Sequence, residues 1–207
     1  MVRALYLWAC ERLYHELAPG YDVISRLVSA GAWPGWRRTV LPHVRGGRVL
    51  EIGFGTGELL DELAGLQSIR VTGLELSPQM QAVAARRLAD QGEGARRVQA
   101  AAGTMPFGDR SFDTVVSTFP APYILEPDTL AECARVLQGG GRLVVGGLWV
   151  RVRNASLRRS VPLFYADPPA AALAQIAQQV EEAGFRVKWH YEVVGWADIP
   201  VLVAELP

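Results

Sequence analysis

The pattern of apolar and polar positions alternates between strand-like and helix-like spacing along most of the chain. Residues 49–52 form a run of β type that leads into glycines, and a helical stretch follows from 58 to 65. Further runs of these two kinds predict strands over 69–74, 95–100, 112–117 and 142–150 and helices over 78–90 and 128–137. Strands that alternate with helices form a parallel sheet covered on both faces, so the pattern predicts an α/β fold.

The end of the chain follows a different pattern. A helical stretch over 169–183 precedes two β-like runs, 185–194 and 200–206, which only residues 195–198 separate. Two strands joined so closely must be antiparallel, because a parallel pair needs a long crossover. The expected sheet therefore has seven strands and is mixed, with the last strand antiparallel.

The start of the chain reads as helical and aromatic. Tyr and Trp side chains recur among Leu, Val and Arg over residues 2–43, and this predicts two or three short helices before the main fold. At 207 residues, half of them apolar, the chain can bury one good core. We expect a single structural domain with a helical N-terminal cap over 1–47 and an α/β core over 48–207.

Charge and cysteine content narrow the range of partners. The net charge is zero and Lys188 is the sole lysine, so nucleic-acid binding is not favoured. Cys10 and Cys133 are too few for a disulfide framework or a zinc site, and we expect two core residues in a reducing cytosol. Charges interrupt the apolar segment over 1–18, and no uncharged run of about twenty apolar residues follows. The expectation is a cytoplasmic protein without a transmembrane segment, which leaves peripheral membrane contact open.

The most informative segment is a glycine loop between a predicted strand and a predicted helix. It reads Glu51-Ile52-Gly53-Phe54-Gly55-Thr56-Gly57, and backbone amides at such a helix start can hold a polar ligand that approaches closely over glycine. Glu75 ends the next strand eighteen residues after Gly57, where a carboxylate can accept both hydroxyl protons of a ribose. Loop and acid together predict a ligand that contains a nucleoside.

A nicotinamide dehydrogenase is one alternative interpretation of this loop. Its G-x-G-x-x-G fingerprint has a small third residue where the helix packs on the strand. Glu58 occupies that position here, and the glycines follow the pattern G-x-G-x-G. A dehydrogenase is therefore the third choice, behind the two functions given below.

Four segments in order resemble the motifs of class I S-adenosylmethionine-dependent methyltransferases. They are Val49-Leu50-Glu51-Ile52-Gly53-Phe54-Gly55-Thr56-Gly57, Leu74-Glu75-Leu76-Ser77-Pro78-Gln79-Met80, Met105-Pro106-Phe107 before Phe112-Asp113-Thr114-Val115-Val116-Ser117, and Ala134-Arg135-Val136-Leu137-Gln138-Gly139-Gly140-Gly141-Arg142-Leu143. The resemblance covers residues 48 to about 147, and the C-terminal hairpin also matches the Rossmann-like seven-stranded sheet of that family.

The resemblance implies S-adenosylmethionine as cofactor and S-adenosylhomocysteine as product. The three loop glycines would line the methionine and ribose, Glu75 would take the ribose hydroxyls and Leu76 would pack on adenine. Glu51 would orient the loop or meet the cofactor's ammonium through water. The complete set of expected cofactor-binding residues is Glu51, Gly53, Gly55, Gly57, Glu75, Leu76, Met80, Ala101, Ala102 and Ser117.

One position departs from the family pattern. Ala101 stands where the family usually has an Asp that binds the amino group of adenine, although the amide of Ala102 can still serve adenine. The alternative function is therefore a non-catalytic module that binds S-adenosylmethionine or a nucleotide. It is motivated by Ala101 and by the lack of an evident base.

The acceptor is less clear from the residues. The sequence Thr118-Phe119-Pro120-Ala121 lacks the Asn- or Asp-Pro-Pro-aromatic tetrad of adenine-N6 and related amino methyltransferases. The segments Tyr21-Asp22-Val23-Ile24-Ser25, Ser29-Ala30-Gly31 and Trp36-Arg37-Arg38 resemble the entry helices of quinone-biosynthesis C-methyltransferases and some phospholipid N-methyltransferases. Methyl transfer to a small-molecule or lipid-like acceptor is the preferred function, and Tyr14 and Tyr21 are expected to line the pocket.

A further expectation concerns residues 149–165, where family members place a substrate cap. This insertion contains Arg151, Arg153, Arg158 and Arg159 and no acid. A solvated loop and an anion-binding loop are both compatible with this composition, and the second would suit an anionic acceptor. We assign no catalytic residue and no metal site.

Overall fold

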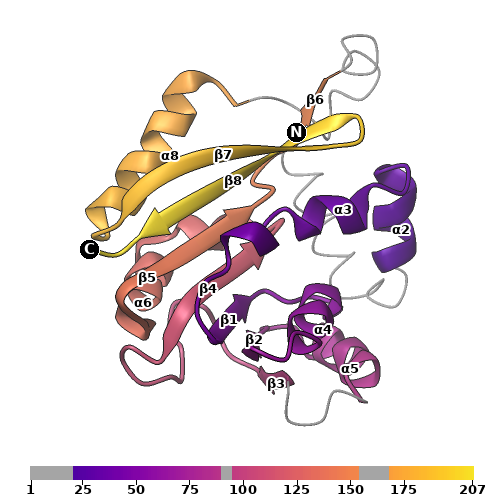
Figure 1. Ribbon diagram of the computed structural model, residues 1–207, viewed down its shortest axis with the longest axis horizontal. Helices are drawn as coiled ribbons and strands as arrows, with labels where there is room; N and C mark the ends of the chain where they lie inside the picture. Colours follow the sequence, from indigo (N-terminus) through magenta and orange to yellow (C-terminus); the bar gives the residue numbers. More distant parts are fainter. Residues whose placement is uncertain (1–20, 90–94, 154–167) are drawn as a thin grey trace.

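The computed structural model describes residues 21–89, 95–153 and 168–207 (Figure 1). Within these residues, eight strands form one sheet in the order β3-β2-β1-β4-β5-β8-β6, and β7 also pairs with β8. The strands are β1 (Arg48–Ile52), β2 (Arg70–Leu74), β3 (Ala95–Val98), β4 (Phe112–Thr118), β5 (Leu137–Gly146), β6 (Arg151–Val152), β7 (Arg186–Val194) and β8 (Ala197–Glu205).

The first five strands are parallel, as predicted. β1 pairs with β2 on one side and with β4 on the other, so the strand order reverses between β1 and β4. Ligands of open α/β sheets bind beyond the carboxyl ends of the strands at such a switch point. The glycine loop follows β1 directly and therefore lies at this point.

The C-terminal hairpin is antiparallel, as its short connection predicts. β7 and β8 are joined by Gly195 and Trp196 alone, and β8 pairs antiparallel with β5 on its other side. The predicted second strand began too late, because backbone pairing with β7 already starts at Ala197.

The predicted count of seven strands is one short. The eighth strand is β6, whose two residues pair with Asp198 and Ala197 at the start of β8. So short a strand leaves no recognisable period in the sequence.

β5 also begins earlier than predicted, because helix α6 passes directly into it at Leu137. The register with β4 shifts between Phe112 and Thr114, opposite the glycines that the pattern had assigned to a loop. Gly140 has a φ of 75°, which accommodates this irregularity in the strand.

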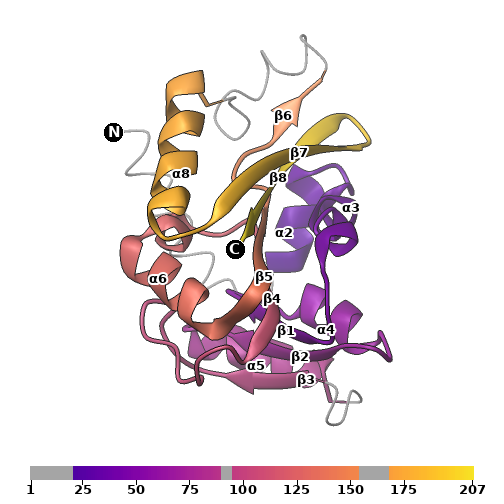
Figure 2. The same cartoon turned by 60° about the vertical axis from the view of Figure 1, so that its left-hand side comes forward.

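Helices cover both faces of the sheet (Figure 2). They are α2 (Tyr21–Val28), α3 (Trp33–Arg38), α4 (Glu58–Ala64), α5 (Pro78–Arg87), α6 (Pro127–Val136) and α8 (Ala170–Glu182), with short 3-10 helices η2 (Leu41–His43) and η4 (Pro122–Leu125). α6 and α8 lie on one face, and α2, α3 and α4 lie on the other.

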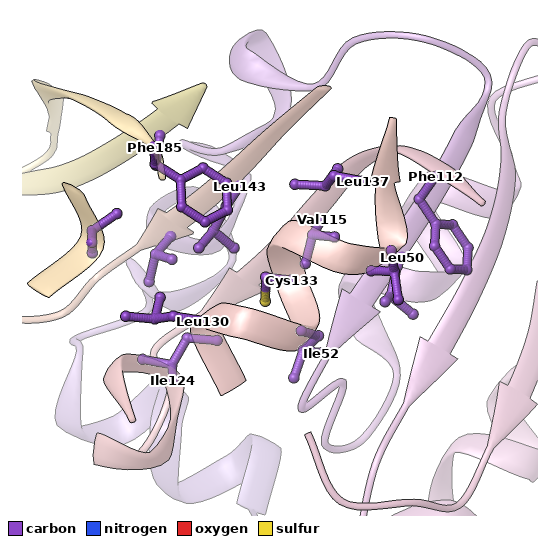
Figure 3. Close-up of a cluster of buried hydrophobic side chains, with 14 of the residues drawn as sticks. Leu50, Ile52, Phe112, Val115, Ile124, Leu130, Cys133, Leu137, Leu143 and Phe185 are labelled. Atoms are coloured by element: carbon purple, nitrogen blue, oxygen red, sulfur yellow. The ribbon is translucent and has the colours of Figure 1, made fainter. Parts of the chain in front are cut away.

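Two apolar clusters fill the space between the sheet and its helices. On the side of α6, Leu50 and Ile52 of β1 pack with Leu130 and Cys133 (Figure 3). Burial raises the pKa of the Cys133 thiol to about 12, which agrees with the expectation of an inert core residue. On the other side, Val49 packs among the apolar residues of α4. Four successive residues of β1, from Val49 to Ile52, are therefore buried because both faces of the strand are covered.

The N-terminal helix α3 is anchored to the core by charge and by aromatic packing. The Arg37 guanidinium pairs with the carboxylates of Glu58 and Glu62 on α4. Trp36 is almost fully buried, and its ring meets that of Trp196 edge-on at 5.0 Å between centroids. The described part of the N-terminal region thus packs beside the helix that follows the glycine loop.

Candidate functional site

The glycine loop between β1 and α4 owes its shape to left-handed backbone. Gly53, Gly55 and Gly57 have φ values of 69°, 55° and 80°. Residues with a Cβ rarely adopt these angles, which explains why glycine recurs at every second position. Helix α4 follows the loop directly; it begins at Glu58, with Gly57 as its N-cap residue.

The surroundings of the three glycines differ. A Cβ on Gly53 would stand 2.2 Å from the Tyr123 hydroxyl oxygen, and a Cβ on Gly57 would stand 2.9 Å from the Cβ of Ala84. No described atom lies within 4 Å of the corresponding point at Gly55. Gly55 is therefore the loop glycine that leaves room for a ligand.

Glu75 lies beside this open position. One of its carboxylate oxygens, Oε2, accepts a hydrogen bond from the Gly55 amide at 3.1 Å, and the other, Oε1, accepts one from the Ser77 amide at 2.8 Å. A carboxylate oxygen has two lone-pair sites, so each oxygen can still accept a ligand hydroxyl. The structure thus brings together the loop and the acid that the spacing relates.

Glu51 lies beneath the loop. Its side chain is 2% exposed, and no described residue hydrogen-bonds to its Oε2 atom. Burial raises the pKa of this carboxyl well above its ordinary value, and the carboxylates of Glu75 and Glu62 add to the rise while Arg37 opposes it. An unsatisfied buried oxygen at this place suits a ligand that donates a hydrogen bond or carries positive charge.

Comparison with known proteins decides the family. Residues 49–141 match the model of the methyltransferase domain. A demethylmenaquinone methyltransferase from Renibacterium salmoninarum is 31% identical over 203 residues, which cover 90% of this chain and 83% of that protein. The chain belongs to the class I S-adenosylmethionine-dependent methyltransferases.

Other relatives agree on the family and the fold. A demethylmenaquinone methyltransferase from Thermus thermophilus is 36% identical over 140 residues, or 64% of this chain and 63% of that protein. The match therefore spans less than two thirds of the Thermus relative. The crystal structure of an S-adenosylmethionine-dependent methyltransferase from Thermotoga maritima, described as a possible histamine N-methyltransferase, has a TM-score of 0.66 at 22% identity. It covers 95% of this chain and 99% of that one.

The residues expected near adenine follow β2 and β3 at the carboxyl edge of the sheet. Leu76 leaves 63% of its surface exposed, Ala101 is exposed, and Ala102 is partly buried against the core. The side-chain amide of Gln99 donates to the Leu76 carbonyl at 3.2 Å, which ties the ends of the two strands together. An apolar, accessible surface at this edge is compatible with the predicted contact to adenine.

Two of the predicted cofactor residues are interior. Met80 is fully buried, and its amide donates to the Ser77 hydroxyl at 3.3 Å. Ser117 is also fully buried, and its hydroxyl donates to the Ile52 carbonyl at 2.7 Å. Ser117 thus ties β4 to the end of β1, Met80 lies in the first turn of α5, and direct contact of either residue with a ligand stays a prediction.

The residues expected to bind the acceptor are described only in part. Tyr14, Arg158 and Arg159 lie outside the described residues, and only the backbone of Tyr21, at the start of α2, is described. The Arg151 guanidinium lies 4.9 Å from the centroid of the Tyr191 ring, and Arg153 Nε lies 3.7 Å from Asp198 Oδ1. Both arginines thus contact the β7–β8 hairpin.

Sequence reasoning missed two aromatic residues after β4. Tyr123 reaches the glycine loop from η4, and Phe119 has a φ of 48°, which is rare for a residue with a Cβ. The Phe119 ring lies against Gly147, where a Cβ would stand 2.4 Å away, and its centroid is 4.3 Å from that of Trp33. Neither residue belongs to a motif, and their positions depend on contacts distant in the sequence.

Gly55→Val is predicted to abolish binding of the family's methyl donor while the protein still folds. The valine would fill the open position and place a β-branched residue in left-handed backbone, at a cost of about 1–2 kcal/mol in unfolding free energy. Gly140→Val is the matched control, because Gly140 also has a positive φ and open surroundings but lies on β5. Titration calorimetry and thermal unfolding of both variants test this, and equal loss of binding in both would contradict a ligand-facing Gly55.

Glu51→Gln is predicted to change the pH dependence of stability. The folded protein holds the Glu51 proton more tightly than the unfolded chain does, so the contribution of Glu51 to the unfolding free energy falls as pH rises from its ordinary pKa through its raised one. Glutamine does not titrate, and the variant should therefore gain stability relative to wild type as pH rises above the ordinary pKa of a glutamate. Urea unfolding at a series of pH values measures this change in relative stability, with Glu181→Gln, at an exposed position of α8, as the control. A difference in unfolding free energy between Glu51→Gln and wild type that does not vary with pH would contradict the raised pKa of Glu51.

Proposed function

We propose that this protein transfers a methyl group from S-adenosylmethionine to a lipid-like acceptor with a quinone-type ring. Binding of the methyl donor is supported chiefly by one observation. Glu75 contacts the Gly55 amide beside an open position at the switch point of the sheet. A carboxylate that can accept hydroxyl hydrogens thus lies next to a glycine with open surroundings, and this supports a ribose at that point.

The described residues fit the donor in three places. Glu75 would accept the ribose hydroxyls, Leu76 and Ala102 would flank adenine, and the loop from Gly53 to Gly57 would hold the methionine part. Glu75 makes this end of the sheet electronegative, and Glu51 adds a buried oxygen without a described partner, which suits a ligand with a sulfonium and an ammonium group. When bound, S-adenosylmethionine supplies a methyl group that is already electrophilic. The task of the protein is then chiefly to hold donor and acceptor in line.

The proposed identity of the methyl acceptor is supported by the names of the relatives and by one aromatic surface. Both relatives described above carry the name demethylmenaquinone methyltransferase. The rings of Trp33 and Phe119 contact each other at the carboxyl end of β4, with ring planes tilted by 32°, and both residues remain partly exposed. A flat apolar ring can pack on such a surface with the offset geometry that aromatic groups prefer.

Charge gives less support to an anionic acceptor. Arg151 and Arg153 have neighbours on the hairpin in Tyr191 and Asp198. The proposal therefore places the apolar ring of the acceptor ahead of any negative charge that it carries.

One helix supports contact with a lipid surface. Val23 and Leu27 lie four residues apart on α2 and are 61% and 75% exposed, so they project from one side of the helix. We propose that this side touches the membrane in which a lipid-like acceptor dissolves. No helix of the described residues is long and apolar enough to cross a membrane.

Glu75→Gln is predicted to weaken S-adenosylmethionine binding by about tenfold to a hundredfold, since hydrogen bonds to a charged group contribute about 1.5–3 kcal/mol. The amide keeps the shape of the side chain but loses an acceptor and the charge. Calorimetry measures the dissociation constants of S-adenosylmethionine, S-adenosylhomocysteine and NAD, and Glu182→Gln is the control. Transfer of labelled methyl to a demethylated naphthoquinol should fall in parallel. Wild type that binds the donor but labels no quinol would favour a binding module, and binding of NAD would favour a dehydrogenase.

Ala101→Asp is predicted to tighten donor binding by about fivefold. The exposed side chain follows β3, and an added carboxylate could accept a hydrogen bond from the amino group of adenine, a gain of roughly 1 kcal/mol. A donor analogue without that amino group should show no gain, and Ala101→Asn controls for side-chain size. Unchanged affinity for S-adenosylmethionine would mean that adenine lies elsewhere.

A further inference from the structure

Tyr123 reaches the glycine loop from the far side of the switch point. It belongs to η4, which follows β4, and packs at the margin of the core on the side of α6. Its hydroxyl oxygen lies so close to Gly53 that a Cβ there would stand 2.2 Å away. The phenol therefore touches the backbone of the loop at the carboxyl end of β1.

The hydrogen of this phenol has a defined direction. Ser117 donates its own hydroxyl hydrogen to the Ile52 carbonyl, so in its hydrogen bond with Tyr123 it can only accept. Tyr123 consequently donates its hydrogen to Ser117. The oxygen lone pairs are left on the side of the phenol that is turned away from Ser117.

The surroundings keep this phenol neutral. Burial raises the pKa of Tyr123 far above its ordinary value, and the negative charge of Glu75 raises it further. The group cannot act as a base in the neutral pH range. It offers an oriented dipole whose negative end is the oxygen, in a place where burial strengthens the interaction of dipoles with charges.

We propose that Tyr123 is a specificity-determining residue of the donor site: its oxygen, oriented by Ser117 over Gly53, faces the sulfonium end of the donor. This rests on the proposed function. S-adenosylmethionine and S-adenosylhomocysteine differ by the methyl group and by one positive charge at sulfur. A fixed dipole with its negative end toward sulfur favours the charged donor and gains little from the uncharged product. Tyr123 thus helps the site to retain substrate and release product.

The test is the ratio of two affinities in Tyr123→Phe, which keeps the ring and removes only the oxygen. We expect the dissociation constant of S-adenosylmethionine to rise by about three- to tenfold and that of S-adenosylhomocysteine to change by less than about twofold. Tyr191→Phe, on β7 at the other end of the sheet order, is the matched control and should change neither constant. Titration calorimetry measures all values.

Ser117→Ala gives a second, independent measurement. This variant keeps the phenol but removes the acceptor of its hydrogen, so discrimination between donor and product should fall in the same direction. If the loss of the buried bond to Ile52 prevents folding, Tyr123→Phe still decides the matter. Equal weakening of both ligands in Tyr123→Phe, or no change in either, overturns the role of Tyr123 alone. Failure of wild type to bind either ligand overturns the proposed function itself.

Discussion

The contact between Glu75 and the backbone amides of Gly55 and Ser77 is the interaction on which the site depends. It joins the residue after β2 to the loop after β1, and it holds the carboxylate in one orientation before any ligand arrives. A side chain already fixed by two hydrogen bonds loses little further freedom on binding, so more of the interaction with a ribose appears as affinity. The same contact keeps the loop in the left-handed shape that only glycine adopts readily.

Charge around the loop is arranged in two layers. Glu75 is accessible to a ligand, whereas Glu51 lies buried beneath it with an oxygen that no described residue satisfies. Arg37 of α3 offsets part of this negative charge and also pairs with Glu58 and Glu62 of α4. One guanidinium therefore links the N-terminal helices, the helix after the glycine loop and the acid below it. A change in the position of α3 would therefore change the pKa of Glu51, because it would move the Arg37 guanidinium.

The two sides of the switch point have different tasks. The β1 and β2 side presents polar groups, with the Glu75 carboxylate held by the backbone amides of Gly55 and Ser77. The β4 side presents aromatic residues, with Tyr123 against Gly53 and Phe119 against Gly147 and Trp33. The unusual backbone of Phe119 is maintained by an amide hydrogen bond to the Gly146 carbonyl at 2.8 Å and by the space above Gly147. Strained residues of this kind concentrate at functional sites, where surrounding contacts compensate for their cost.

The sequence alone determined the features that depend on local order along the chain. Alternating strands and helices predicted the parallel sheet, the short connection predicted the antiparallel hairpin, and the glycine loop with Glu75 predicted the donor end of the site. These features could be read because hydrophobic period, glycine backbone freedom and strand-end position are properties of neighbouring residues. Tertiary structure alone decided that β5 starts at Leu137, that Ser117 and Met80 are buried, and that Gly53 makes room for Tyr123. Each of these depends on contacts between segments far apart in sequence, such as η4 against the loop after β1, which no local pattern records.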